Sequence, residues 1–221
     1  MTVLKSLAVW MAVFWLGLGL GFAQDATNRA GELKSWREQC NDPDPDLRLA
    51  YIEKAIDGGD VSVKRICIRL ALESDNADIR NLGLRAAISS VPSVSFAVQI
   101  PGELEAATKA AGDDEKKLAE IARWYVSQDF TRLRNGLVFE IDGAAVSNGE
   151  SVWYPLAGLS QRNDKYRGKT TVVGSELNWT GRASLAQPEC SLNAKLLSDN
   201  TLSGTFQCGV EPSFPVTAKL L

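Results

Sequence analysis

The chain has 221 residues, of which 45% are hydrophobic, and a formal net charge of −3. This mild acidic surplus, without a charged tail, argues against nucleic acid or an anionic membrane as the partner. The sequence contains no histidine, which excludes Ser-His-Asp and Cys-His nucleophile systems and the zinc and non-haem iron sites that use histidine ligands. An enzyme built from this chain would have to use carboxylates, lysine or tyrosine.

The first 23 residues have the pattern of a secretory signal peptide. Lys5 supplies a short positive region, an uncharged apolar run follows, and small residues precede a cut after Ala23. The alternative is a retained membrane anchor, but Gly17, Gly19 and Gly21 weaken a spanning helix. We therefore expect a periplasmic or secreted protein with no stable membrane anchor after cleavage.

Residues 24–134 carry the period of helices and predict a helical domain. One helix has Pro45 near its first turn and stops at Gly58, the next begins with Asp60 as its N-cap, and a third ends before Pro92. A short apolar extended run follows. The stretch "DDEKKLAEIARWYVSQDFTRLR", residues 113–134, predicts one further strong helix.

Two of these helices align with each other when Asp46 is set against Asp78. "DLRLAYIEKAI" and "DIRNLGLRAAI" each have an acidic residue at the helix start, an arginine two positions on, and then small and apolar positions. This pattern resembles the HEAT-type helical repeats. The resemblance implies a scaffold whose surface contacts another molecule, with no chemistry attached. The alternative is that two ordinary amphipathic helices happen to align.

After Asn135 and Gly136 the period changes from 3.6 to 2. Seven short strand candidates follow: "LVFEI", "SVWYPL", "KTTVVG", "ELNWTG", "CSLNAKLL", "TLSGTFQC" and "SFPVTAKLL". Gly, Asn, Asp and Pro separate them, which is typical of a small antiparallel sandwich or barrel over residues 137–221. The predicted fold class is thus α+β in two domains: an all-α, HEAT-like domain followed by a small β-sandwich or barrel.

The four cysteines predict two disulfides, as is usual for an even number in an exported chain. Pairing Cys190 with Cys208 across a hairpin places every apolar side chain between them on one face and every polar side chain on the other, and a slip of one residue would destroy this partition. Asn200 suits a left-handed turn position. By elimination Cys40 pairs with Cys67, and a free, buried Cys67 is the alternative. The cysteine spacing gives no support for a redox or zinc site.

Three aromatic residues are candidate contacts for a ligand or partner: Trp153, Tyr154 and Tyr166. Exposed aromatic rings could stack on a sugar or anchor a protein; the alternative is packing against the helical domain. Candidate carboxylates for glycoside hydrolysis would have to line one cleft: they are Glu140, Asp142, Glu176 and Glu189. The sequence predicts no catalytic residue, metal ligand or cofactor site.

These observations lead us to expect an exported, non-catalytic binding or scaffold protein of the cell envelope that acts through protein–protein contacts. The partner would be another envelope protein, and a glycan is possible. The alternatives are a carbohydrate-binding or carbohydrate-active module and an inhibitor of a secreted hydrolase.

Overall fold

The computed structural model describes residues 25–220. The signal peptide expected at residues 1–23 therefore lies outside the described residues. The chain divides into two compact units between Cys67 and Ile68, and each is described by itself. Among the described residues, no helix is long and apolar enough to cross a bilayer.

The first unit is helical. Residues 25–39 form a helix, and α2 (Pro45–Asp57) and the beginning of α3 (Val61–Leu72) follow it. Asp44 caps α2, because its carboxylate accepts two main-chain N–H groups of the first turn, and Asp60 caps α3 in the same way. The predicted starts of both helices are confirmed.

A disulfide ties this unit together. Cys40 and Cys67 are bonded, their Cα atoms lie 5.4 Å apart, and neither side chain is exposed to solvent. The pairing expected by elimination is confirmed. The bond joins the residue that follows the first helix to a buried position of α3.

The second unit starts with the end of α3 and with α4 (Ala77–Ser89). The amide oxygen of Asn76 caps α4 by accepting the N–H groups of Asp78 and Ile79. Gly83 lets the two helices approach closely, because a Cβ atom there would lie 2.8 Å from the Cβ of Ala71.

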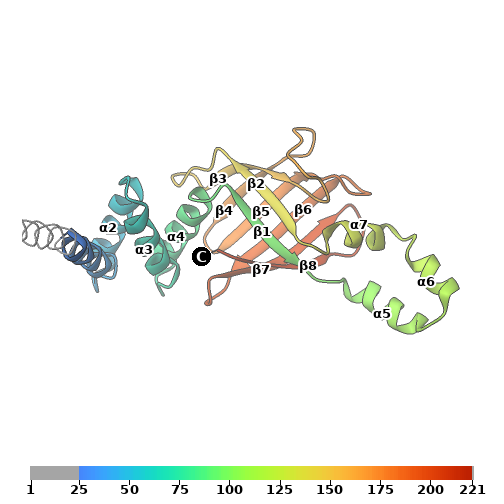
Figure 1. Ribbon diagram of the computed structural model, residues 1–221. Helices are drawn as coiled ribbons and strands as arrows, with labels where there is room; N and C mark the ends of the chain where they lie inside the picture. The colour runs from blue at the N-terminus through green and yellow to red at the C-terminus, as the bar shows by residue number, and fades with distance from the viewer. Residues whose placement is uncertain (1–24, 221) are drawn as a thin grey trace, which may run out of the picture. The chain divides into compact units, whose positions relative to one another are not determined.

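Eight antiparallel strands form a closed barrel in which every strand pairs with its neighbours in the chain and β8 pairs with β1 (Figure 1). The strands are β1 (Ser93–Val98), β2 (Leu137–Asp142), β3 (Glu150–Pro155), β4 (Gly168–Val173), β5 (Glu176–Arg182), β6 (Glu189–Leu196), β7 (Thr201–Cys208) and β8 (Phe214–Lys219). The seven strands predicted after residue 136 are all present. The eighth, β1, lies in the extended run among the predicted helices.

Apolar side chains fill the inside of the barrel, and polar side chains cover most of the outside. An eight-stranded barrel is just wide enough inside to be filled by side chains or to hold one small ligand. Phe139 lies in the interior and is fully buried. Its ring centroid lies 5.1 Å from that of Trp179, 5.3 Å from Trp153, 6.0 Å from Phe96 and 6.4 Å from Phe206.

Helices lie against both ends of the barrel (Figure 1). At one end the guanidinium group of Arg80, on α4, donates to the carbonyl oxygen of Leu197 over 3.2 Å. At the other end is α7 (Tyr125–Leu133), where the carboxylate of Asp129 accepts the main-chain N–H of Ala186 over 3.0 Å. The barrel is thus a filled cylinder with a helix attached at each end.

The chain between β1 and β2 forms α5 (Gly102–Ala111), α6 (Glu115–Ile121) and α7. Leu104, Ala111 and Ile121 make a small apolar cluster of their own there. The single helix predicted over residues 113–134 is wrong, because it breaks between α6 and α7 at Trp124, whose main chain is extended.

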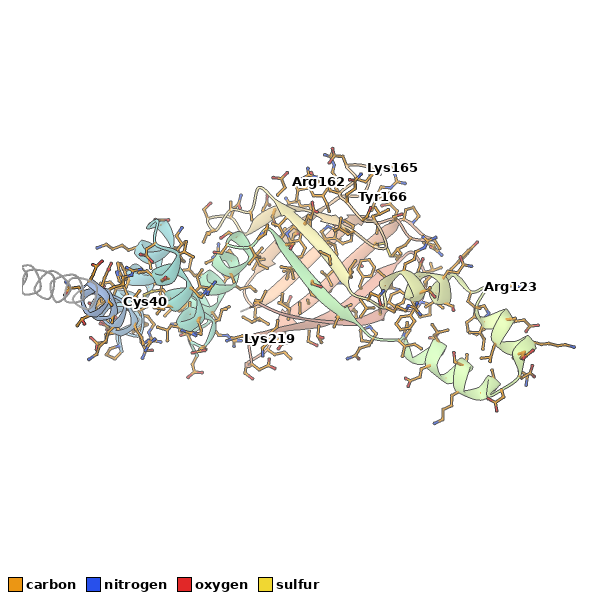
Figure 2. All side chains as sticks on the ribbon, in the orientation of Figure 1. Cys40, Arg123, Arg162, Lys165, Tyr166 and Lys219 are labelled. Atoms are coloured by element: carbon orange, nitrogen blue, oxygen red, sulfur yellow. A yellow bond between two sulfur atoms is a disulfide. The ribbon has the colours of Figure 1, made fainter. Side chains whose placement is uncertain are left out.

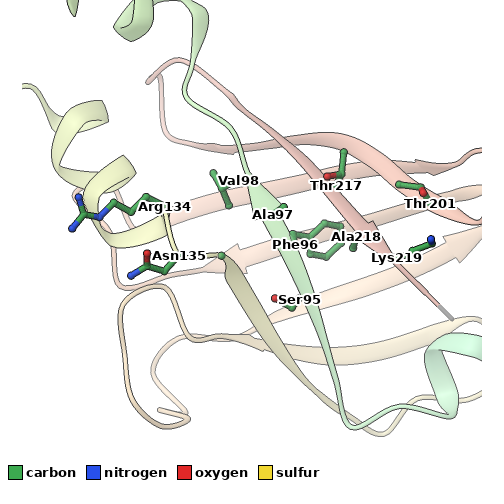
Figure 3. Close-up of a pocket in the computed structure, with 11 residues that line it drawn as sticks. Ser95, Phe96, Ala97, Val98, Arg134, Asn135, Thr201, Thr217, Ala218 and Lys219 are labelled. Atoms are coloured by element: carbon green, nitrogen blue, oxygen red, sulfur yellow. The ribbon is translucent and has the colours of Figure 1, made fainter.

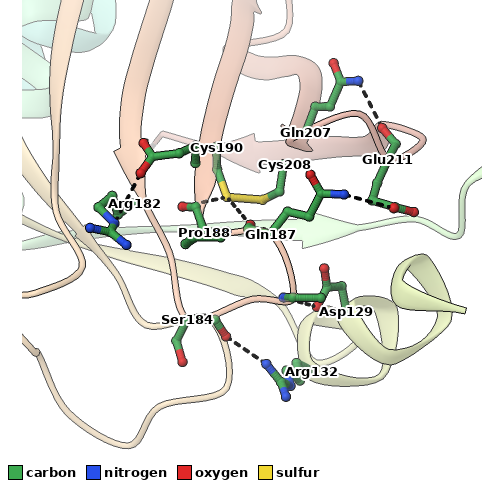
Figure 4. The surroundings of a disulfide bond; sticks show 12 residues. Asp129, Arg132, Arg182, Ser184, Gln187, Pro188, Cys190, Gln207, Cys208 and Glu211 are labelled. Atoms are coloured by element: carbon green, nitrogen blue, oxygen red, sulfur yellow. Dashed lines mark hydrogen bonds and ion pairs between the residues drawn. A yellow bond between two sulfur atoms is a disulfide. The ribbon is translucent and has the colours of Figure 1, made fainter. Parts of the chain in front are cut away.

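The hairpin of β6 and β7 has the predicted register. Cys190 is opposite Cys208, Leu192 is opposite Phe206, and the two cysteines are bonded. Asn200 has a φ of 63°, the left-handed conformation expected of it. Figure 4 shows the disulfide on the side of the barrel where α7 lies.

The predicted fold class is wrong. Residues 25–220 contain no separate N-terminal all-α, HEAT-like domain: the helices there are short and interleaved with strands, and three of them are inserted between β1 and β2. The two aligned helices belong to different units, α2 to the first and α4 to the second. The β part is a closed barrel that takes in a strand from the stretch expected to be helical.

Candidate functional site

Trp153, one of the predicted aromatic contacts, lies inside the barrel and is not accessible to a ligand. Its side chain has no exposed area, and its indole N–H donates to the hydroxyl of Ser151 over 2.7 Å. Its ring packs against Phe139. Trp153 is therefore part of the core and cannot stack on a ligand from solvent.

Tyr154 points outward from the same strand but is covered by an arginine. Its side chain is 4% exposed, and the guanidinium carbon of Arg162 lies 3.5 Å from the centroid of its ring. Arg162 also contacts Asp142 over 3.3 Å and Asp164 over 3.1 Å. The ring face that a sugar would need is occupied.

Tyr166 is half-buried in the loop between β3 and β4, near Lys165, whose ammonium nitrogen lies 5.9 Å from the ring centroid. Arg162, Lys165 and Tyr166 lie on the same loop (Figure 2). Tyr154 lines a groove of about 530 Å³ on the neighbouring strands.

The structure does not gather the four candidate carboxylates into one cleft. Asp142 pairs with Arg162. Glu189 pairs with Arg182 at the start of β6, whereas Glu176 starts β5 at the opposite end of the barrel. Among residues 25–220, no group of three or more cysteine and acidic side chains could hold a metal ion.

The pairing between β1 and β8 covers fewer residues than any other in the barrel, counted over the described chain. Only Ala97 and Val98 are in register with β8, opposite Thr217 and Val216, whereas β6 and β7 pair at seven positions. β1 and β8, which close the barrel, are therefore the neighbouring strands with the fewest paired residues among those described.

Two hydrogen bonds show which way the backbone of β1 points. The carbonyl oxygen of Pro92 accepts the N–H of Ile141 from β2, and the N–H of Gln99 donates to the carbonyl of Pro215 from β8. Main-chain groups of successive strand residues point alternately to the two neighbouring strands. Ser93 and Ser95 therefore direct their N–H and C=O groups toward β8.

By the same alternation Lys219 directs its main-chain groups toward β1, because Thr217 does so. Ser95 and Lys219 would be the next pair after Ala97 and Thr217, but the described register stops before them. Both residues line a groove of about 610 Å³ on the outside of this seam. We call it the seam groove (Figure 3).

The seam groove has a floor of small residues and a cation toward each end. Ser95 and Ala97 are exposed along β1, Arg134 lies at the end of α7, and Lys219 lies near the end of β8 (Figure 3). The other lining residues are Phe96, Val98, Asn135, Gly136, Thr201, Thr217 and Ala218. Among these described residues two are cationic and none is acidic.

The charges of the seam groove differ from those of the groove beside Tyr154. There Lys169 contacts Glu150 over 2.7 Å, and Asp142 contacts Arg162. In the part of the chain that the structure describes, neither Arg134 nor Lys219 has an ion-pair partner. The seam groove therefore has two cations and no acidic lining residue, whereas the groove beside Tyr154 has Asp142 in its lining together with Arg167 and Lys169.

A second exposed feature is aromatic. Trp124 is 45% exposed and Tyr125 is 57% exposed, side by side where α7 begins. The helical period places Tyr125 on the core side of the predicted helix, and the break at Trp124 turns it outward instead. These two residues and the seam groove are not among the candidates that the sequence suggested.

Comparisons with known proteins do not identify the chain. No family model matches it, and neither the curated proteins nor the solved structures contain a match.

Proposed function

We propose that the chain is an exported, non-catalytic binding protein of the cell envelope that acts through protein–protein contacts. The observation that carries the proposal is the exposed pair Trp124 and Tyr125, in a unit that buries Trp153 and Trp179 completely. Tryptophan and tyrosine are enriched among the residues that dominate the binding energy of protein interfaces. We call this pair the aromatic corner.

The helix α7, at whose start the aromatic corner lies, is attached to the barrel by hydrogen bonds and by a buried side chain. The guanidinium group of Arg132 donates to the carbonyl oxygen of Ser184 over 3.0 Å, Leu133 is fully buried, and Asp129 accepts the N–H of Ala186. Figure 4 shows Asp129 and Arg132 on α7 with their contacts to the loop between β5 and β6. A helix fixed to the barrel orders little further on binding, which favours affinity.

The filled barrel supports a partner that binds outside. Hollow barrels of this size hold a ligand among their inward side chains, but here the inward side chains contact one another. The carbohydrate alternative required exposed aromatic rings beside converging carboxylates. Trp153 and Tyr154 are 0% and 4% exposed, and the candidate carboxylates do not share one cleft, so we do not carry it further. An inhibitor of a secreted hydrolase would be one kind of protein-binding role.

The proposed location is the periplasm or the outside of the cell. The two disulfides are compatible with an oxidising compartment. Export through a signal peptide cleaved after Ala23 is part of the same proposal.

The test is affinity capture from an envelope extract, with cross-linking and mass spectrometry of what is bound. We compare the mature chain with Trp124→Ala/Tyr125→Ala and with a matched control, Val173→Ala/Val210→Ala, whose apolar side chains are 70% and 88% exposed. We expect a specific partner to be lost at least about tenfold from the aromatic variant and retained by the control. Equal capture by both variants, or no specific partner at all, would overturn the proposal.

A further inference from the structure

We propose that the seam groove binds an extended, acidic peptide segment, which adds as a short strand along the free edge of β1. The inference does not rest on the aromatic corner, and it assigns a different surface and a defined ligand chemistry. Two features of the seam point to this ligand: the direction of the backbone groups and the charge of the groove.

The backbone of β1 at Ser95 is directed toward β8. The N–H and C=O groups of Ser95 point to that strand, yet the described register between the two strands ends at Ala97 and Thr217. Unpaired strand edges are templates for an added strand, because the main chain of a peptide satisfies them whatever its side chains are. Phe96 points into the core and is fully buried, so β1 itself is anchored while its edge is available.

The floor of the groove suits a main chain that lies close to it. Ser95 and Ala97 are the outward residues of β1 here and are small. Gly136 lies beside them, and a Cβ atom at that position would lie 3.5 Å from the Ser95 hydroxyl. Large outward side chains would keep a peptide backbone away from the sheet edge, and these positions have none.

The charge of the groove favours an acidic segment. Arg134 and Lys219 lie toward the two ends of the groove (Figure 3), in a chain whose net charge is −3. Side chains on one face of an extended peptide recur at every second residue, so alternate carboxylates can reach both cations. The guanidinium group of Arg134 can donate two parallel hydrogen bonds to a carboxylate, and the hydroxyls of Thr201 and Thr217 line the path between.

The experiment measures the binding of a labelled hexapeptide, Val-Asp-Val-Asp-Val-Asp with an amidated C-terminus, to the mature chain by fluorescence anisotropy. Two control peptides separate the arguments. The Val-Asn-Val-Asn-Val-Asn peptide keeps the main chain and removes the charge, and a peptide with N-methylated valines keeps the charge and removes main-chain donors. Sulfate is added as a competitor to detect a site for small anions.

The variant Arg134→Gln/Lys219→Gln is compared with Arg123→Gln/Lys195→Gln, in which an equal charge is removed at exposed positions outside the groove. All four positions are exposed, so folding is not at risk. Exposed ion pairs are worth about two- to fivefold each, and we expect the groove variant to weaken binding about four- to twenty-fivefold. Amide signals of Ser95 and Lys219 should shift on peptide addition, and those of Ser203 should not.

The result expected is binding of the acidic peptide, with loss in the groove variant, in the N-methylated peptide and in the Asn peptide. The proposal fails if no binding is seen at millimolar peptide or if the control variant weakens binding as much as the groove variant. It also fails if the Asn peptide binds as well as the Asp peptide. Full competition by sulfate would mean a small-anion site only, and pairing of two copies of the chain at the seam would show as a dimer; either result overturns it.

Discussion

Phe139→Ala tests whether the barrel is filled. The Phe139 side chain is fully buried and its ring contacts four other aromatic rings. Truncating a core Phe to Ala costs about 3–5 kcal/mol because of lost burial and the cavity left behind. Each aromatic pair adds about 0.5–1.5 kcal/mol beyond its buried area. We therefore expect the free energy of unfolding to fall by about 4 kcal/mol or more.

The assay is urea unfolding followed by the fluorescence of the tryptophans, of which Trp153 and Trp179 are fully buried next to Phe139. Phe139→Leu keeps most of the volume and loses the ring contacts, so it should cost at least about 2 kcal/mol but less than Phe139→Ala. It also provides a measurement if the alanine variant does not fold. Val173→Ala, at a position 70% exposed, is the control and should change stability by less than about 0.5 kcal/mol.

A fall in the free energy of unfolding of less than about 1 kcal/mol for Phe139→Ala would refute the reasoning, because removing a phenylalanine ring from a packed interior costs several times more. It would mean that the side chains around Phe139 leave space inside the barrel. The interior would then no longer support a partner that binds outside the barrel.

Two more predictions concern the end of the barrel near α7. Replacing Cys190 and Cys208 by Ala should lower the free energy of unfolding by about 3 kcal/mol, from the loop entropy of a cross-link between residues 18 apart; a loss below about 1 kcal/mol in urea unfolding would contradict it. Burial raises the pKa of the Asp129 carboxyl above its ordinary value of 3.8, although the Ala186 N–H opposes the shift. The folded chain therefore holds this proton where the unfolded chain releases it, and the wild type should lose stability relative to Asp129→Asn as the pH rises from 3.8 through the raised pKa. Unfolding midpoints that move in the opposite direction would rule this out.

The local elements of the fold could be predicted from the sequence. The register of the hairpin from Cys190 to Cys208 follows from a period of two, because one slip would turn Leu192 and Phe206 out to solvent. The start of α2 follows from Pro45, which suits a first helical turn, and the start of α3 follows from Asp60, whose side chain caps that turn. In each case the interacting groups are neighbours in the chain or are joined by a short turn.

The position of β1 could not be predicted in this way. The sequence predicts a short apolar extended run in this stretch without giving its bounds, and nothing near it shows that the partners of β1 are Leu137–Glu140 on one side and Val216 and Thr217 on the other. A strand flanked by helices in sequence is assigned to the barrel only when its inward side chains meet the rest of the core. This is why the expected all-α domain was wrong.

The candidate binding surfaces show the same difference between what neighbouring residues determine and what distant contacts determine. The sequence by itself determined which side chains are apolar, which cysteines can pair within a hairpin, and that histidine chemistry is absent. Only the tertiary structure decided that Trp153 is buried, that Trp124 and Tyr125 are exposed, and that Ser95, Arg134 and Lys219 share one groove. The physical reason is that burial and closure depend on contacts between residues far apart in the chain, whereas periodicity and capping depend on neighbours.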